Sequence, residues 1–129
     1  MALNKLIETA DILFSLLVRV SRADFSGFVS CYTCTERRQW KELQCGHFIR
    51  RGYFTVRLDK RNARPQCQRC NEELGGRPDI FEECLREELG DNEVDNLITL
   101  SRQEQHFTEA ELREIIAILR KELRKYGIM

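Results

Sequence analysis

This 129-residue chain has no long apolar run, contains two histidines and carries a formal net charge of zero. The longest apolar run, residues 12–18, is interrupted by Ser15 and is far too short to span a bilayer. Lys5, Glu8 and Asp11 stand within the apolar pattern of the N-terminus, and such charges do not fit the core of a secretory signal. We therefore expect a cytoplasmic protein.

Internal repeats and low-complexity tracts are also missing, which argues against a solenoid or a disordered chain. Hydrophobic residues make up 42% of the sequence, an ordinary value for a globular protein. The length fits one compact domain, or a small core with helical extensions. We predict a single domain over residues 1–129.

The formal net charge of zero excludes no nucleic-acid function, because the charge is unevenly distributed. Residues 46–70 contain seven basic residues against Asp59, a balance of +6. Residues 71–96 contain ten acidic residues against two basic ones, a balance of −8. The basic segment is typical of a surface that contacts a polyanion, whereas the acidic one is more typical of a solvated helix face.

The hydrophobic pattern predicts mostly helices around a small strand-containing centre. Apolar residues spaced by three and four predict an N-terminal helix over 3–21. Short strands are expected within 40–48 and at 62–66, with an arginine-rich loop containing some strand over 49–60. A short helix should begin near Cys67 and end at Gly75-Gly76. Further helices are predicted from Pro78 to about 89, from 91 to 100, and from the capping box at Thr108 to about 126.

Six cysteines in a chain with no expected export signal indicate metal or redox chemistry rather than disulfides. Cys31 and Cys34 form one CxxC pair, and Cys67 and Cys70 form a second. Two residues between thiolates let a tight turn or a helix start present both sulfurs to one tetrahedral ion. We therefore predict one structural zinc, held as in a treble clef, whose binding energy stabilises a centre too small to fold alone.

The two remaining cysteines are not expected to bind zinc. Cys84 lies among apolar residues at helical spacing and is interpreted as a core thiol. Cys45 lies two residues before His47, and a buried side chain on a strand is the favoured interpretation over a metal ligand. A redox dithiol remains the alternative for either CxxC pair.

The residues around the cysteine pairs resemble those of the HNH nucleases. That pattern has a histidine on the first strand, an asparagine five residues before a cysteine, and a CxxC followed by His or Asn. In this chain the three positions of that pattern are occupied by His47, Asn62 and Asn71. More narrowly, the segments GHFIRRG and QCQRCN are similar to the NinG/Rap family of phage recombination endonucleases, as are the leading helix and the helical C-terminus. The resemblance implies an α+β fold with a ββα-metal zinc core over 28–76, flanked by helices at 3–21 and 79–126.

The resemblance also implies a catalytic set of His47, Asn62 and Asn71. Hydrolysis of a phosphodiester needs a base, and His47 is the only histidine in this segment, with an ordinary pKa near 6.5. The amide oxygen of Asn71 is a hard ligand suited to a catalytic Mg²⁺ or Mn²⁺ ion. Asn62 is expected to hydrogen-bond the loop and steady the histidine. The expected DNA-phosphate contacts are made by arginines of the basic segment: Arg50, Arg51, Arg57, Arg61 and Arg64.

One position departs from the HNH pattern. Many HNH nucleases carry Asp or His immediately before the catalytic histidine as a second metal ligand, whereas this chain has Gly46. Glycine has no side chain with which to coordinate a metal. This predicts weak binding of the catalytic ion in the absence of DNA.

The sequence leaves several alternatives open. A histidine beside a zinc site is sometimes only packed, and Asn71 at a helix start is sometimes only a cap. A zinc module that binds nucleic acid without cutting it, or a thiol oxidoreductase, would also carry CxxC pairs. If the family likeness holds, the substrate is branched DNA and the protein acts in the cytoplasm of a phage-infected bacterium. The apolar faces of the terminal helices either cover the zinc centre or contribute to a homodimer interface.

Overall fold

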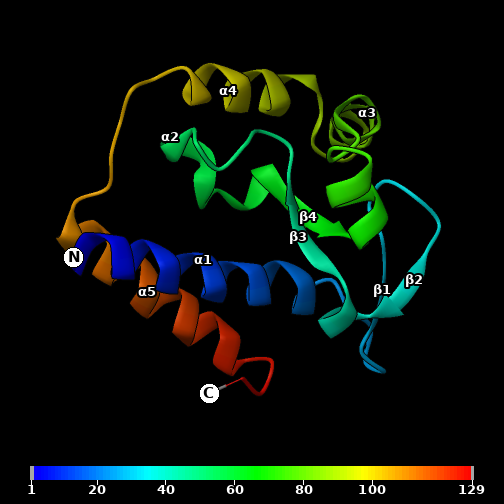
Figure 1. Cartoon of the computed structure of the whole chain (residues 1–129), viewed down its shortest axis with the longest axis horizontal. Coiled ribbons are helices and arrows are strands. Elements are labelled where there is room, and N and C mark those ends of the chain that lie inside the picture. The colour runs from blue at the N-terminus through cyan, green and yellow to red at the C-terminus, as the bar shows by residue number, and fades with distance from the viewer. Residues whose placement is uncertain (1, 129) are drawn as a thin grey trace.

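The computed structural model describes residues 2–128, which form an α+β fold with two small antiparallel sheets (Figure 1). In chain order the elements are α1 (Ala2–Val20), β1 (Phe28–Ser30), β2 (Arg37–Gln39), η1 (Trp40–Glu42), β3 (Gln44–His47), α2 (Phe54–Arg57), η2 (Lys60–Asn62), β4 (Ala63–Gln66), η3 (Arg69–Glu73), α3 (Pro78–Leu89), α4 (Asp91–Ser101) and α5 (Glu109–Arg124). η1 and η2 are 3₁₀ turns, and η3 is a single π-helical turn. Among the described residues, no helix is both long enough and apolar enough to cross a membrane.

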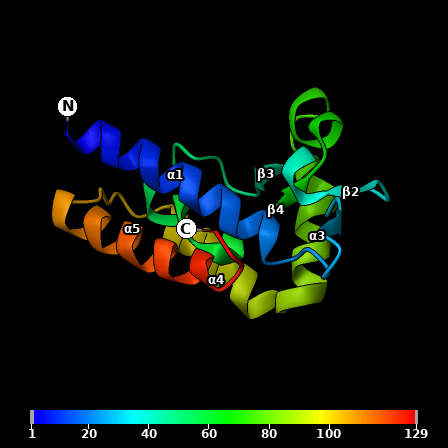
Figure 2. The same cartoon turned by 90° about the horizontal axis from the view of Figure 1, so that it is seen from below.

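The terminal helices form one layer of the molecule. α1 and α5 lie side by side and run in the same direction, as the views in Figures 1 and 2 both show. Their facing residues form the largest apolar cluster, which includes Phe14 and Leu112. The capping box predicted from Thr108 and Glu111 is present at the start of α5. The apolar faces of these helices are thus largely buried within the chain.

The β3–β4 hairpin, whose first strand ends at His47, lies next to α1. β3 pairs antiparallel with β4, so that Gln44 faces Gln66 and His47 faces Ala63. Ala63 joins the α1–α5 cluster, and Cys45 packs against its edge. The packing of the β3–β4 hairpin on α1 therefore brings the N-terminal helix to the predicted site.

α3 and α4 cover the other side of the hairpin, as Figure 1 shows. Phe81, Leu85 and Val94 are fully buried between them, and Phe48 packs on this cluster. Gly90, at φ 89°, makes the turn between the two helices and adopts a backbone conformation that L side chains rarely take. Both helix starts and the Gly90 break match the expectations from sequence.

Two predicted elements need correction. The segment 49–60, expected to be a loop with some strand, contains the short helix α2 and no strand. The helix expected after Cys67 is the single π turn η3, followed by the predicted Gly75-Gly76 turn. Both segments are short enough that contacts with neighbouring elements decide their conformation over local propensity.

Candidate metal centre and polar cleft

The four cysteines of the CxxC pairs form one cluster. Their sulfur atoms all lie within 4.8 Å of one another, and Cys34 Sγ lies 3.7 Å from Cys67 Sγ. In a tetrahedral zinc site with Zn–S bonds of about 2.3 Å, neighbouring sulfurs are separated by roughly 3.8 Å. The cysteines are therefore positioned to bind a metal ion, consistent with a structural zinc.

Backbone amides support this donor set. The N–H of Cys67 donates to Cys31 Sγ at 3.2 Å, that of Cys70 to Cys67 Sγ at 3.4 Å, and that of Glu36 to Cys34 Sγ at 3.4 Å. Such N–H donors stabilise the thiolate form that a metal requires. Three of the four cysteines are buried and Cys34 is half-buried, which shields the cluster from water.

Cys45 and Cys84 lie outside the cluster. Cys84 is half-buried on α3. Cys45 is half-buried on β3, and burial raises the pKa of its thiol to about 12. Burial also raises the pKa of Cys84, so both thiols stay neutral near pH 7, and Cys45 is the strand side chain expected from sequence.

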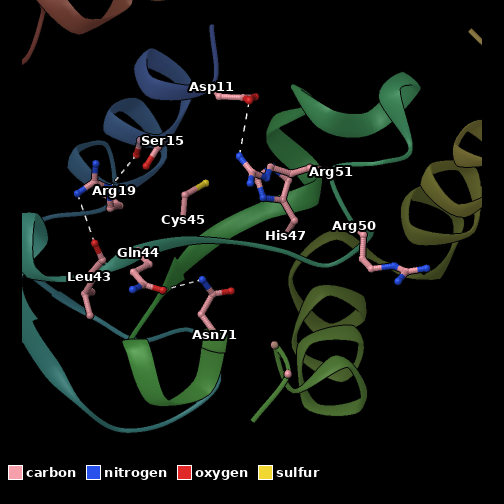
Figure 3. Close-up of a pocket in the computed structure, with 12 residues that line it drawn as sticks. Asp11, Ser15, Arg19, Leu43, Gln44, Cys45, His47, Arg50, Arg51 and Asn71 are labelled. Atoms are coloured by element: carbon pink, nitrogen blue, oxygen red, sulfur yellow. Dashed lines mark hydrogen bonds and ion pairs between the residues drawn. The ribbon is translucent and has the colours of Figure 1, made fainter. Parts of the chain in front are cut away.

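A polar cleft of about 620 Å³ lies between α1, β3 and η3. Figure 3 shows its walls: α1 on one side, β3 along the floor, and η3 with the glycine turn on the other side. His47 and Asn71 both line this cleft. The sequence separates them by 23 intervening residues, and the β3–β4 pairing together with the cysteine cluster brings them to one space.

His47 ends β3 with its ring held on two sides. Nε2 lies 3.0 Å from the carbonyl oxygen of Arg57, and the ring packs on Phe14 of α1 with centroids 5.9 Å apart. Because a carbonyl only accepts, Nε2 carries the proton and Nδ1 keeps its lone pair. Burial lowers the pKa of His47 below 6.5, so the imidazole is neutral near pH 7. The ring is thus an oriented, unprotonated base.

The amide of Asn71 is oriented by its neighbours. Its Nδ2 donates to Gln44 Oε1 at 2.8 Å, and Gln44 Nε2 donates to the carboxylate of Glu72. A carboxylate only accepts, so Glu72 fixes which end of the Gln44 amide faces Asn71, and Gln44 in turn fixes the Asn71 amide. Within residues 2–128 no donor hydrogen-bonds Asn71 Oδ1. The oxygen expected to bind a metal is therefore the free end of this amide.

Asn62 is a positioning residue rather than a cleft residue. Its side chain is fully buried; Oδ1 accepts from the N–H of Ile49 at 2.8 Å, and Nδ2 donates to the carbonyls of Ile49 and Val56. These bonds hold the segment that follows His47 and leads to Arg57, the residue whose carbonyl binds the imidazole. The hydrogen bonding of the loop expected from sequence is present.

Gly46 pairs with Arg64 in the hairpin and does not line the cleft, and a Cβ at this position would point at the side chain of Gln66. A Cβ at position 46 would lie 1.7 Å from Gln66 Oε1, an impossible contact. Gln66 is itself fully buried and donates to Thr33 Oγ1 and to the carbonyl of Gly76, each at 2.9 Å. Glycine at 46 is thus required by packing, and no side-chain ligand fits there in this arrangement.

The five arginines predicted to contact DNA fall into two groups. Arg50 and Arg51 are exposed and line the cleft; Arg51 also lies 3.6 Å from Asp11. The other three have their guanidinium groups engaged inside the molecule: Arg57 with Asp11, Arg61 with Asp59 and Glu93, and Arg64 with Glu88.

Arg64 needs correction as a DNA contact. Only 3% of its surface is exposed, and it donates to the carbonyls of Lys60 and Ala63 as well as to Glu88. A guanidinium with these partners is part of the core and does not face a phosphate backbone.

The contribution of α1 to the cleft was not predicted from the sequence. Asp11, Ser15 and Arg19 line it, each four residues from the next and so on one helix face. The signal was present as a polar stripe on an amphipathic helix, but such a stripe is usually only solvated. Gln44 was also missed, because an isolated glutamine on a strand carries no pattern.

The fold and the site together define a small α+β protein with four cysteines positioned to bind a metal ion, beside a cleft that holds a neutral histidine. Comparison with known proteins gives the family: a family model described as bacteriophage lambda NinG protein matches residues 2–127, and the chain belongs to this family. Searches of curated proteins and of solved structures gave no significant match.

Proposed function

We propose that this protein is a metal-dependent DNA endonuclease of the HNH type, in which the cysteine cluster, β3–β4 and η3 form a treble-clef-like ββα-metal core. One observation carries the proposal. His47 and Asn71 line the same polar cleft, and among residues 2–128 neither His47 Nδ1 nor Asn71 Oδ1 has a hydrogen-bond partner. Base and metal ligand are the two groups that hydrolysis of a phosphodiester requires.

Each side chain has a role in this proposal. His47 takes a proton from the attacking water at Nδ1, while the Arg57 carbonyl holds Nε2–H and stabilises the positive charge that develops. A bound Mg²⁺ or Mn²⁺ would stabilise negative charge on the phosphate and the leaving 3′ oxygen. Asn71 Oδ1 would hold that ion, and Arg50 and Arg51 bind the phosphates on either side. The products carry a 5′ phosphate and a 3′ hydroxyl.

The residues present fit a weakly held catalytic ion. Asn71 supplies one oxygen, and Gly46 supplies none. Asp11, the carboxylate that lines the cleft, is engaged by Arg57 and Arg51. DNA oxygens and water must complete the coordination shell, so Mg²⁺ should bind the free protein weakly. Calorimetry that detects tight Mg²⁺ binding without DNA would contradict the single-ligand proposal.

The biological setting follows the family rather than any contact in the cleft. Membership of the NinG family supports branched recombination intermediates as substrate and the cytoplasm of a phage-infected bacterium as location. A homodimer with two active sites would suit a branched substrate. Light scattering, alone and with a four-way junction, tests the oligomeric state.

The decisive experiment compares wild type with His47→Ala on supercoiled plasmid and on a branched DNA substrate, with Mg²⁺ or Mn²⁺. Loss of a general base lowers the cleavage rate by about 10²–10⁴-fold. His106→Ala is the matched control, because His106 is exposed and does not line the cleft, and it should cut normally. Zinc content of both variants should match wild type, and thermal unfolding should show that both are folded at the assay temperature.

The pH profile adds an independent readout. Because burial lowers the pKa of His47, cleavage by the wild type should persist below pH 6.5 and fall only at more acidic pH. A rate that already halves above pH 6.5 would contradict the role of His47 as the buried base.

A non-catalytic zinc module that binds nucleic acid is the rival function. It would need the four cysteines and the cleft arginines, but neither a free imidazole nitrogen nor an oriented amide beside them. If wild type and His47→Ala bind DNA equally and neither cuts any substrate with either metal, the module is the correct assignment.

A further inference from the structure

We propose that Arg19 of α1 binds a phosphate of the DNA backbone next to the scissile one, so that the N-terminal helix forms part of the DNA-binding site. This inference rests on the proposed function. It assigns a DNA contact outside the basic segment 46–70, on a helix that carries none of the catalytic or zinc-binding residues.

Arg19 is held in a fixed orientation at the cleft wall. Its Nε donates to the carbonyl of Ser15 at 3.0 Å, and its Nη1 donates to the carbonyl of Leu43 at 3.3 Å. The guanidinium carbon lies 5.5 Å from the centre of the Trp40 ring. A side chain fixed on three sides loses little conformational entropy when it binds an anion.

Arg19 differs from most of the buried and half-buried arginines in having no acidic partner. Arg57, Arg61, Arg64 and Arg86 each pair with at least one carboxylate. Arg77 also lacks a carboxylate partner, but it donates to Cys70 Sγ and does not line the cleft. Among residues 2–128, no carboxylate forms an ion pair with Arg19. Burial lowers the pKa of Arg19, which reflects a cation removed from water without a counter-charge. An anion in the cleft would supply that counter-charge.

The layout of the cleft agrees with a run of phosphates. In Figure 3, Arg19 and Leu43 lie at one end, Arg50 lies at the other, and His47 and Asn71 lie between them. Three arginines line the cleft against one acid, Asp11, which is already paired with Arg57. A backbone along the cleft would place the scissile phosphate between His47 and Asn71, with flanking phosphates at the two cationic ends.

A purely structural role is the competing explanation, since Arg19 also ties α1 to η1 and β3. The salt dependence of DNA binding separates the two. Each phosphate contact contributes about 0.9 to the slope of log Kobs against log salt for duplex DNA. A structural arginine contributes nothing to that slope.

The test measures binding of a labelled duplex and a labelled four-way junction, without divalent metal, over a range of salt concentrations. Arg19→Met removes the charge, Arg19→Gln removes it but keeps hydrogen-bond donors, and Arg19→Lys keeps it. Arg120→Met, on the exposed surface of α5, is the control for loss of one positive charge. Thermal unfolding and zinc content establish that each variant is folded.

We expect the slope to fall by about one in both neutral variants, with roughly ten-fold weaker binding at moderate salt. Arg19→Lys should keep the slope, and Arg120→Met should match wild type. A folded neutral variant with the wild-type slope would overturn the proposal, as would loss of the fold in both neutral variants. No DNA binding by the wild type would overturn the nuclease proposal and this site with it, whereas wild-type binding with unchanged slopes overturns the Arg19 site alone.

Discussion

The two sides of the cleft, the α1–α5 layer and the region around the cysteine cluster, differ in the interactions that stabilise them. The α1–α5 layer buries a large apolar cluster that includes Leu13, Phe14, Leu112 and Leu119. Among residues 2–128, the cluster around the four CxxC cysteines contains, besides cysteines, only Val29 and Leu43 as buried apolar residues. Hydrophobic burial therefore stabilises the helical side, whereas we expect a bound metal ion to stabilise the other side.

This difference matters because the candidate site lies across the boundary. His47 packs on Phe14 of the helical layer, whereas Asn71 is placed by the cysteine cluster through η3. The geometry that brings the proposed base and the proposed metal ligand together thus depends on both sources of stability at once. Four substitutions test whether the two sides are stabilised in these different ways, and they are given from the largest expected effect to the smallest.

Cys67→Ser should unfold the part of the protein around the cysteine cluster, which we expect a bound metal ion to stabilise. Structural zinc contributes about 10–16 kcal/mol of apparent binding free energy in finger peptides, so losing one ligand should cost several kcal/mol. We expect less than one zinc per chain, loss of native NMR dispersion for β3–β4 and η3, and retention of much of the helical circular dichroism. Cys84→Ser is the control, since Cys84 lies outside the cluster. A Cys67→Ser protein with one bound zinc and a native spectrum would contradict the assignment.

Leu112→Ala tests the helical side. Leu112 is fully buried, and truncating such a residue lowers the free energy of unfolding by about 2–5 kcal/mol through lost burial and a cavity. Denaturant unfolding should detect this change while the zinc content stays at one per chain. Ile118→Ala on the same helix removes a side chain of a residue that is 52% exposed and should change stability by less than about 0.5 kcal/mol. Zinc loss in Leu112→Ala would show that the two sides are not independent.

Glu88→Gln tests the ion network that joins α3 to both sides. Burial raises the pKa of Glu88, but hydrogen bonds from Arg22, Tyr32 and Arg64 outweigh it and lower the pKa to about 2. Because the folded pKa lies below the ordinary value of 4.5, this stabilisation is present above pH 4.5 and is lost as the pH falls toward 2.

The carboxylate is 35% exposed, so solvent screens part of the interaction, and the substitution should cost about 1–2 kcal/mol at pH 7. The difference from wild type should shrink as unfolding is measured at lower pH. Glu87→Gln is the neighbouring exposed control. An equal difference at pH 7 and at pH 3 would contradict the network.

Gln44→Leu should give the smallest change, confined to the site. Without the Gln44 carbonyl the Asn71 amide is free to turn, so its oxygen faces the cleft for only part of the time. We expect about three- to ten-fold more Mg²⁺ to be needed for half-maximal cleavage, which corresponds to roughly 1 kcal/mol. The side-chain amide resonances of Asn71 should also shift without any metal. Gln68→Leu, at an exposed position, should change neither quantity.

Features with a local chemical cause were predictable from the sequence. The spacing of Cys31, Cys34, Cys67 and Cys70 predicted the cysteine cluster, because the CxxC spacing itself limits the distance between the two sulfurs of each pair. The proline at position 78, Gly90 and the capping box at Thr108 marked the ends of the C-terminal helices, because they act within one turn of the backbone.

Features that depend on long-range partners were not predictable. Arg50 and Arg64 look alike in a basic segment, yet one is exposed at the cleft and the other is buried against Glu88, 24 residues along the chain. The helical wall of the cleft depends on α1 packing against β3, and no local pattern encodes that contact. The role of His47 as a catalytic base stays a prediction, which the cleavage assay of His47→Ala tests.

The contact between Gly46 and Gln66 has a consequence for how related sequences can vary. An acidic residue at 46 would collide with Gln66, and Gln66 also ties β4 to Thr33 and to the Gly76 turn. The two positions are therefore expected to covary: chains that carry a carboxylate at 46 should have a smaller residue at 66 and another anchor for the turn. A single substitution that installs a second ligand should fail, and only a paired exchange would open that route.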